Sequence, residues 1–393
     1  MTGFPAQALA VAAVVVGLWG FAAALHLGTL AAASVFYRAP RPDRVPRVRF
    51  LTLIPAHDEA LVIGACLAAL LADRRPDDPV VVVADRCTDE TAAIARRMGA
   101  IVLERGPDAA PGRAAARQAG LELARGLSDW DTVLMVDADS IVEPGFYDAC
   151  ERMLASGADA VQARSEGAPG TSFAAEASVA AFTLQGVTIP RGRDRLLRAV
   201  RLRGTGMAVR RDVVLGHRFH APASEDLFFT IDLLLAGVRC RHVDAARLRS
   251  AGAPNWHAFG GQKVRYEAGR MAGARAYVPR LLATAVRRRD LACLEAAWFL
   301  ATPPLGVAVL SLAVGAGLAV LAGATAVAAV YAAGLAAIGL TVVTGLVQAR
   351  AGLRTWAALA AAPVYVVWKG VVQARAFVRV VRRDRHFEPT ARA

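Results

Sequence analysis

The stretch Val133-Leu134-Met135-Val136-Asp137-Ala138-Asp139 decides the fold, because an unbroken apolar run leads directly into two carboxylates one residue apart. Such a run is typical of a strand buried on both faces of a parallel sheet. Ligands of open α/β sheets bind beyond the carboxyl ends of the strands. Two carboxylates there favour a divalent cation, Mg²⁺ or Mn²⁺, that bridges phosphate oxygens. For an Asp-x-Asp taken alone, an acidic pair in a surface turn is the alternative interpretation.

The residues around that stretch predict the sheet to which it belongs. Further strands are expected over 49–54, 80–84 and 100–103, and helices over 59–71, 91–98 and from Gly112 onward. The order β-α-β-α-β-α-β predicts an α/β domain with a doubly wound parallel sheet. His57, Asp85, Asp137 and Asp139 then fall at the same edge of this sheet. Convergence of four polar side chains at one edge favours a binding site over an incidental turn.

The chain is too apolar for an ordinary soluble enzyme, since 55% of its 393 residues are hydrophobic. Residues 6–30 carry no acidic or basic side chain except His26, and about 20 apolar residues suffice to cross a bilayer. No basic segment precedes them, so we expect a retained anchor, not a cleaved signal peptide. Five arginines follow between 38 and 49, which by the positive-inside rule places the next domain in the cytoplasm. Residues 298–321 and 325–347 predict a membrane hairpin.

The net charge of +13 comes almost entirely from arginine, because lysine occurs only at Lys263 and Lys369. The arginines cluster beside the hydrophobic spans and lack interleaved aromatic residues. Membrane lipids with anionic headgroups therefore explain the charge better than nucleic acid does, and we expect no nucleic-acid partner. The five cysteines are scattered without metal-ligand spacing, so reduced thiols are expected.

Three later segments also carry polar residues suited to a site. The first, Arg203-Gly204-Thr205-Gly206-Met207, is a glycine-flanked turn at which backbone can approach a ligand. The second, Ser224-Glu225-Asp226-Leu227, begins a helix, and its acids could alternatively serve only the helix dipole. The third, Gln262-Lys263-Val264-Arg265-Tyr266, places Gln262 and Tyr266 on one helical face. An amphipathic helix on the membrane would show the same pattern, and both interpretations can hold together.

Five segments together resemble family-2 glycosyltransferases in their order and rough spacing. They are residues 54–59, 84–89, 137–139, 224–226 and 262–266. The likeness is to the membrane-integrated branch that includes cellulose, chitin and hyaluronan synthases and many bacterial exopolysaccharide enzymes, and it covers about 48–270. It implies a nucleotide-sugar-binding, GT-A-like domain flanked by transmembrane helices.

The resemblance also implies a role for each matching residue. Donor binding is implied for Pro55, His57, Glu59, Asp85, Arg113, Asp137, Gln262 and Arg265. Asp85 would bind the nucleobase and ribose, Asp139 with Asp137 would bind the metal, and Asp226 would be the catalytic base. Acceptor binding is implied for Gly204, Glu225 and Tyr266.

Three positions depart from the family pattern. Ser224 stands in place of threonine, and Arg113 stands where lysine is common but can still face phosphate. Tyr266 replaces tryptophan, which makes a smaller platform for an acceptor sugar. With few C-terminal spans to form a polymer channel, this favours transfer of a single sugar.

The chemistry of sugar transfer agrees with this residue set. A divalent cation and an arginine neutralise the leaving diphosphate, and one carboxylate deprotonates the acceptor hydroxyl. No carboxylate nucleophile is needed, so inversion is expected. The resulting prediction is a metal-dependent inverting transferase that uses a nucleoside diphosphate sugar, with a UDP-sugar favoured, and a glycan or lipid-linked acceptor. The alternatives are a polyprenyl-phosphate glycosyltransferase and an inactive sugar-nucleotide-binding scaffold; a transporter fits least, because the spans lack mid-membrane charges.

We expect five parts along the chain. They are a transmembrane anchor over 1–36, a cytosolic catalytic domain over 47–250, amphipathic interface helices over 251–295, a transmembrane hairpin over 296–349, and a helix with a basic tail over 355–393. The location implied is the bacterial inner membrane. Residues 355–380 either lie in the interface or cross the bilayer. The tail resembles an aromatic-x-x-Thr-x-Arg ending, in which Thr390 and Arg392 would cap the bound nucleotide; a frayed terminus is the alternative.

Overall fold

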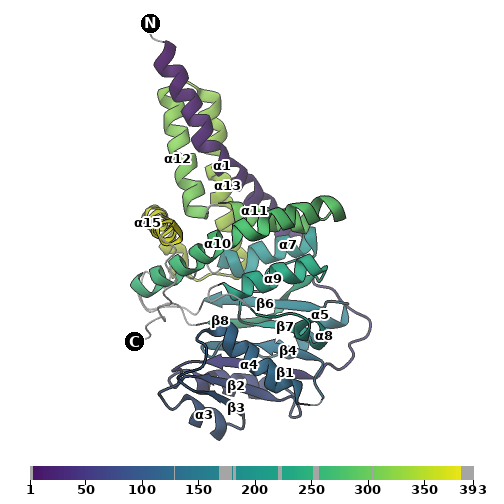
Figure 1. The fold of residues 1–393 in the computed structure, drawn as a ribbon. Coiled ribbons are helices and arrows are strands. Elements are labelled where there is room, and N and C mark those ends of the chain that lie inside the picture. Colours follow the sequence, from purple (N-terminus) through teal and green to yellow (C-terminus); the bar gives the residue numbers. More distant parts are fainter. Residues whose placement is uncertain are drawn as a thin grey trace.

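A computed structural model describes residues 3–127, 129–167, 179, 183–219, 224–250, 256–302 and 304–381. Its centre is an eight-stranded mixed sheet with the order β3-β2-β1-β4-β7-β6-β8-β5 (Figure 1). The strands are β1 (Phe50–Ala56), β2 (Val80–Asp85), β3 (Ile101–Arg105), β4 (Thr132–Met135), β5 (Ser140–Val142), β6 (Ala160–Gly167), β7 (Met207–Arg210) and β8 (Cys240–Ser250).

Half of this sheet is parallel, as predicted. Strands β3, β2, β1 and β4 pair in parallel, and β1, β2 and β4 are buried along their whole length. The prediction covered these four strands only, and the strands beyond them make the sheet mixed. Strand β7 is antiparallel to both β4 and β6, β5 is antiparallel to β8, and β6 is parallel to β8. After β4 the chain passes through residues 136–139 into β5 without a crossover helix, and β5 lies at the far edge of the sheet beside β8 and not beside β4.

Short helices cover the parallel half of the sheet. They are α2 (Ile63–Asp73), α3 (Thr91–Arg97), α4 (Arg113–Arg125) and α5 (Phe146–Ala155). Helix α2 begins four residues later than predicted, because Asp58 adopts a left-handed backbone conformation and the turn after it precedes the helix. That turn is held by Thr91, whose Oγ1 accepts a hydrogen bond from the Glu59 backbone N–H.

A second layer of helices separates the sheet from three long helices (Figure 1). It consists of η1 (Leu184–Thr188), α7 (Ile189–Leu197), α9 (Glu225–Ala236), α10 (Trp256–Arg288) and α11 (Leu291–Ala301), while α8 (Arg211–Leu215) flanks β7. Helix α7 packs closely on the first long helix, since a Cβ at Gly192 would lie 2.1 Å from the Leu30 carbonyl oxygen. The part of the chain that forms the sheet and its helices is thereby joined directly to the apolar helices.

The three long apolar helices are α1 (Gly3–Val35), α12 (Leu305–Leu321) and α13 (Thr325–Ala349), which pack side by side. Two stretches, Ala6–Val35 and Thr325–Ala349, are long and apolar enough to cross a membrane. The prediction of one continuous span over 298–321 is wrong, because α11 and α12 are separate helices bent by 71°. Pro304 stands at the start of α12 and cannot donate the hydrogen bond that would continue a helix from α11.

The C-terminal part of the described chain comprises α14 (Leu353–Ala357), η2 (Ala358–Ala361) and α15 (Ala362–Val381). Figure 1 looks along the axis of α15, whereas α1, α12 and α13 are seen lengthwise, so α15 lies across the direction of the long helices. Helix α15 is joined to α10 by an ion pair of 3.3 Å between Lys369 Nζ and Glu267 Oε1. Thr390 and Arg392 lie outside the described residues.

Candidate active site

Polar side chains gather at the carboxyl ends of β1, β2 and β4. His57 and Glu59 follow β1, Asp85 ends β2, and Asp137 and Asp139 follow β4. The four residues expected to share an edge therefore do follow neighbouring parallel strands. Pro55 lies within β1 and is buried.

Asp85 is paired with two basic side chains that sequence patterns did not reveal. Arg105, at the end of β3, donates a hydrogen bond of 2.5 Å from Nη1 to Asp85 Oδ1, and Arg86 Nη2 lies 3.6 Å from Oδ2. His57 Nδ1 lies 2.6 Å from the Asp85 carbonyl oxygen and must donate to it. Because Asp85 is buried and doubly paired, its carboxylate is held rigidly at the strand end.

Asp137 and Asp139 are both partly exposed at the end of β4. Asp137 forms 3.3 Å ion pairs with Arg113 and with Arg117, while Ser140 Oγ donates to Asp139 Oδ1 at 3.4 Å. Since Asp137 already faces two arginines, Asp139 is the carboxylate better suited to bind a cation directly.

The donors around these two carboxylates fit Mg²⁺ or Mn²⁺. Both ions prefer hard oxygen ligands, and the two carboxylates supply them. The neighbouring Cys66 thiol donates to the Asp137 carbonyl oxygen. Burial and the nearby acids raise the pKa of Cys66 to about 12, so it remains a protonated thiol and a poor metal ligand.

Arg117 joins the two halves of the site and was missed by the sequence analysis. Its guanidinium is fully buried and contacts Asp137, Glu225 and the Gly204 carbonyl oxygen, the last two at 2.8 and 2.6 Å. The sequence did contain one indication of its role: Arg117 lies four residues after Arg113, so the two side chains share one face of α4. Nothing local indicated that this face meets residues about 90 to 110 positions away.

Asp226 lies beside the glycine turn at 203–207. A Cβ at Gly204 would stand 3.6 Å from Asp226 Oδ2, and Gly204 has a φ of +84°, which favours glycine. Burial, followed by the charge of Glu225, raises the pKa of Asp226 to about 6, while Arg117 opposes the rise. A carboxylate with this pKa is suited to accept a proton near neutral pH.

Helix α10 carries Arg265 and Tyr266, both partly exposed, and the charge of Asp226 acts on the Tyr266 hydroxyl. Ser224 Oγ donates a 3.4 Å hydrogen bond to the Tyr266 carbonyl oxygen, which fixes α10 to the start of α9. Burial raises the pKa of the Tyr266 hydroxyl, and the charge of Asp226 adds to the rise. The Gln262 side chain lies outside the described part of the structure.

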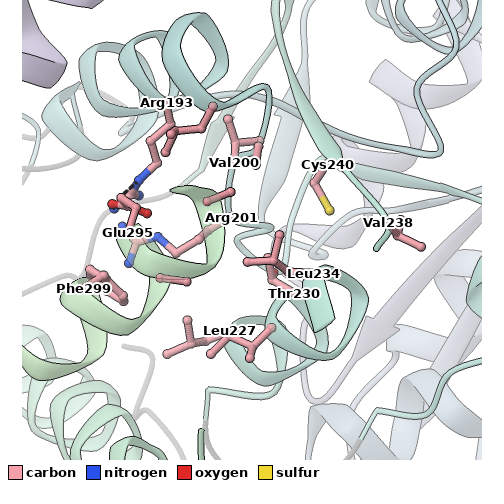
Figure 2. Close-up of a pocket in the computed structure, with 15 residues that line it drawn as sticks. Arg193, Val200, Arg201, Leu227, Thr230, Leu234, Val238, Cys240, Glu295 and Phe299 are labelled. Atoms are coloured by element: carbon pink, nitrogen blue, oxygen red, sulfur yellow. Dashed lines mark hydrogen bonds and ion pairs between the residues drawn. The ribbon is translucent and has the colours of Figure 1, made fainter. Parts of the chain in front are cut away.

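A small cavity of about 30 Å³ lies between α7, α9 and α11 (Figure 2). It is lined mainly by apolar side chains, but Arg193, Arg201 and Glu295 also reach it. No sequence pattern singled out these three residues. Leu227 and Thr230, on the helix that carries Asp226, form part of the same wall.

The pH dependence of activity should report the raised pKa of Asp226. A predicted base such as Asp226 must be deprotonated to act, so kcat/KM is expected to fall as the pH drops through about 6. Glu225→Gln removes the neighbouring negative charge that raises the pKa, so the acid limb should move to lower pH. Measuring kcat/KM from pH 4.5 to 8 in both proteins tests this. An unshifted limb in the variant would contradict the assignment to Asp226.

Comparisons with known proteins agree with this architecture. Residues 46–269 match the family model described as glycosyltransferase-like family 2. A comparison with curated proteins found no match. The fold is similar to that of the mannosyltransferase PcManGT from Pyrobaculum calidifontis, solved with GDP-Man and Mn²⁺. The TM-score is 0.58 at 18% identity, and the match covers 96% of this chain and 99% of that one.

Two further solved structures are similar over part of the chain. Glucosyl-3-phosphoglycerate synthase from Mycobacterium tuberculosis, with Mn²⁺, UDP and phosphoglyceric acid, gives a TM-score of 0.40 at 19% identity, covering 60% of this chain and 78% of that one. S. aureus TarS gives 0.38 at 20% identity, covering 55% and 38%. The synthase has also been solved with Mg²⁺ and UDP.

Proposed function

The chain belongs to the glycosyltransferase-like family 2, and on that premise we propose that it transfers one sugar, with inversion, from a nucleoside diphosphate sugar to a hydroxyl of a glycan or lipid-linked acceptor. The observation that carries this proposal is the position of Arg117. One buried guanidinium contacts Asp137 of the predicted metal motif and Glu225 beside the predicted base. A residue proposed to bind the donor and a residue proposed to bind the acceptor therefore both contact Arg117, which supports the proposal.

In the proposed reaction, Asp226 accepts the proton of the acceptor hydroxyl as its oxygen attacks the anomeric carbon of the donor. The bond from that carbon to the diphosphate breaks, and the electron pair leaves with the nucleoside diphosphate. Arg113 is half-exposed and can reach the leaving phosphates from the start of α4. A divalent cation, when bound by Asp139 and Asp137, would neutralise the charge that develops on the diphosphate.

A turnover assay with the detergent-solubilised protein tests this function. The protein is incubated with a panel of UDP- and GDP-sugars, with Mn²⁺ or Mg²⁺, and nucleotide release is measured with and without lipid-linked and soluble glycan acceptors. Acceptor-stimulated release from one donor supports the proposal. Binding of nucleotide without release from any donor would instead indicate an inactive scaffold, and release only with a free polyprenyl phosphate would indicate the phosphate-acceptor alternative.

Replacing Asp85 with alanine is expected to weaken UDP binding about 10- to 100-fold, whichever sugar is attached. The substitution removes a charge-assisted hydrogen-bond acceptor, worth about 1.5–3 kcal/mol, and leaves Arg105 without that partner. Calorimetric titration with UDP and with UDP-sugars measures the effect. Asp77→Ala is the control, because Asp77 is exposed and pairs only with the surface Arg47 among described residues. A loss confined to one sugar would argue against nucleobase recognition.

We propose that α1 and α13 anchor the enzyme in the bacterial inner membrane with the catalytic domain cytosolic, and that α15 lies in the membrane interface. The crosswise direction of α15 supports the interfacial position. Arginines at 375 and 379, interleaved with apolar residues, suit a helix at the cytoplasmic surface.

A cysteine at position 393 tests this orientation. The residue is expected to be shielded from a membrane-impermeant maleimide in intact cells and labelled after lysis, because the tail would be cytoplasmic. The unmodified protein is the control for Cys87, the only native cysteine that is not buried. Labelling of position 393 in intact cells would overturn the model.

A further inference from the structure

Cationic side chains gather around the ring of Phe299 on α11. The guanidinium carbons of Arg201, Arg193 and Arg270 lie 3.2, 5.5 and 5.6 Å from the ring centroid. We name Arg193, Arg201 and Arg270 the arginine cluster. Figure 2 shows Arg193 and Arg201 converging with Glu295 beside Phe299.

Positive charge exceeds negative charge at this cluster. Glu295 pairs with Arg193, and its Oε1 lies 3.3 Å from Nε2 of His26 on α1. Glu267 is shared between Arg270 and Lys369. Four side chains that are cationic at neutral pH thus face two carboxylates, which pair with Arg193, Arg270 and Lys369. Arg201 forms no ion pair within 4.0 Å among the described residues. Burial and the charge of Arg193 lower the pKa of Arg201 to about 9, as expected for a cation without a close counter-charge.

Arg201 also has hydrogen-bonding capacity to spare. Its Nη1 is buried and makes no hydrogen bond to any described residue. Guanidinium groups bind phosphate oxygens through their planar fork of N–H donors, and the phenyl ring beneath this one holds its plane in place. Arg201 as a whole is only partly buried, so a ligand would approach it from another side than that of the buried Nη1.

The segment that carries Arg201 is fixed to the helix that carries Asp226. The Leu202 N–H donates to Thr230 Oγ1 at 3.0 Å, and Thr230 Oγ1 donates to the Asp226 carbonyl oxygen at 2.7 Å. The hydroxyl of Tyr266 lies within range of both charges, because Arg201 lowers its pKa and Asp226 raises it. A carboxylate, an aromatic side chain and a guanidinium are therefore neighbours here.

We infer that Arg201 is a specificity residue that binds the phosphate of a lipid-linked sugar acceptor. The inference rests on the proposed function and names its acceptor class. A lipid-linked sugar phosphate presents a hydroxyl, a sugar ring and a phosphate, and these three groups suit Asp226, Tyr266 and Arg201 respectively. The lipid would continue past Phe299, at the end of α11 from which the apolar helix α12 departs. The cavity in Figure 2 has room for water only, so the phosphate would bind on the partly exposed side of Arg201.

A binding experiment with a short lipid phosphate tests this inference. Farnesyl phosphate, farnesol, inorganic phosphate and UDP with Mn²⁺ are titrated calorimetrically into the full-length protein in a non-ionic detergent. We expect the native protein to bind farnesyl phosphate at least about tenfold more tightly than farnesol or inorganic phosphate. In Arg201→Gln this preference should disappear, while the affinity for UDP changes less than about twofold.

Two variants keep the result interpretable. Arg195→Gln makes the same change at an exposed position of α7 and should retain the preference. Arg201→Lys keeps the charge and should retain most of it, which separates loss of recognition from loss of folding.

Three results would overturn the inference. They are equal binding of farnesyl phosphate and farnesol by the native protein, loss of UDP binding in Arg201→Gln, and equally tight binding of phosphatidylglycerol. The second would place Arg201 in the donor site, and the third would make the cluster a general lipid contact. Failure of sugar transfer itself would appear separately, as native protein that prefers farnesyl phosphate but releases no nucleotide from any donor.

Discussion

Asp226→Asn is expected to lower the rate of sugar transfer by about 10²- to 10⁴-fold, the usual contribution of a positioned general base. Asparagine keeps the size of the side chain and the oxygen that accepts the Leu227 N–H at 2.9 Å, but cannot take a proton. Donor affinity should remain nearly unchanged, because the residues proposed to bind the donor, among them Asp85 and Asp139, lie at the strand ends and not on α9. Single-turnover transfer and UDP titration, both at pH 7.5, separate the two effects.

The same substitution should not destabilise the fold. The Asp226 carboxyl, whose pKa is raised to about 6, is ionised at pH 7.5. Holding this negative charge in a buried site costs free energy in the folded protein. This ionisation costs folding free energy above its folded pKa and costs nothing below the unfolded pKa. The neutral variant should therefore melt at the same temperature or higher. Asp232→Asn, the same change on the same helix, is the matched control for activity. Near-native transfer by Asp226→Asn would remove Asp226 from the role of base.

Asp139→Ala is expected to abolish the part of donor binding that depends on Mn²⁺ or Mg²⁺. Removal of outer-shell partners of a metal lowers affinity about 10- to 100-fold, so loss of a direct ligand should cost about 100-fold or more. Arg113 and Arg117 already pair with Asp137, and they leave it poorly able to replace the missing carboxylate.

Calorimetric titration of UDP with Mn²⁺ and with EDTA measures this effect. The native protein should lose affinity when the metal is chelated, whereas Asp139→Ala should show the same weak binding under both conditions. Asp148→Ala, at an exposed acid of α5, controls for loss of negative charge. Tight binding by Asp139→Ala that still responds to EDTA would show that other residues hold the cation.

Local sequence patterns were sufficient for several elements. The apolar run before Asp137 predicted β4, because a strand buried on both faces needs an apolar side chain at every position. The apolar stretches at the N-terminus and at 325–347 predicted α1 and α13, because length and apolarity alone decide whether a helix can cross a bilayer. These features depend only on residues that are neighbours in the chain, so they can be predicted from a single sequence.

Other features depend on residues that are distant in the chain, and only the tertiary structure decided them. Arg117 contacts Glu225, which is 108 positions away in the sequence, and Lys369 contacts Glu267, which is 102 positions away. No local sequence pattern predicts either contact. The antiparallel pairing of β7 with β4 and the bend between α11 and α12 likewise depend on how distant segments pack. Burial among such segments raises the pKa of Asp226 and gathers arginines around Phe299. A carboxylate's position can be predicted from its strand, but its proton affinity is determined by the charges and the solvent exclusion that folding brings to it.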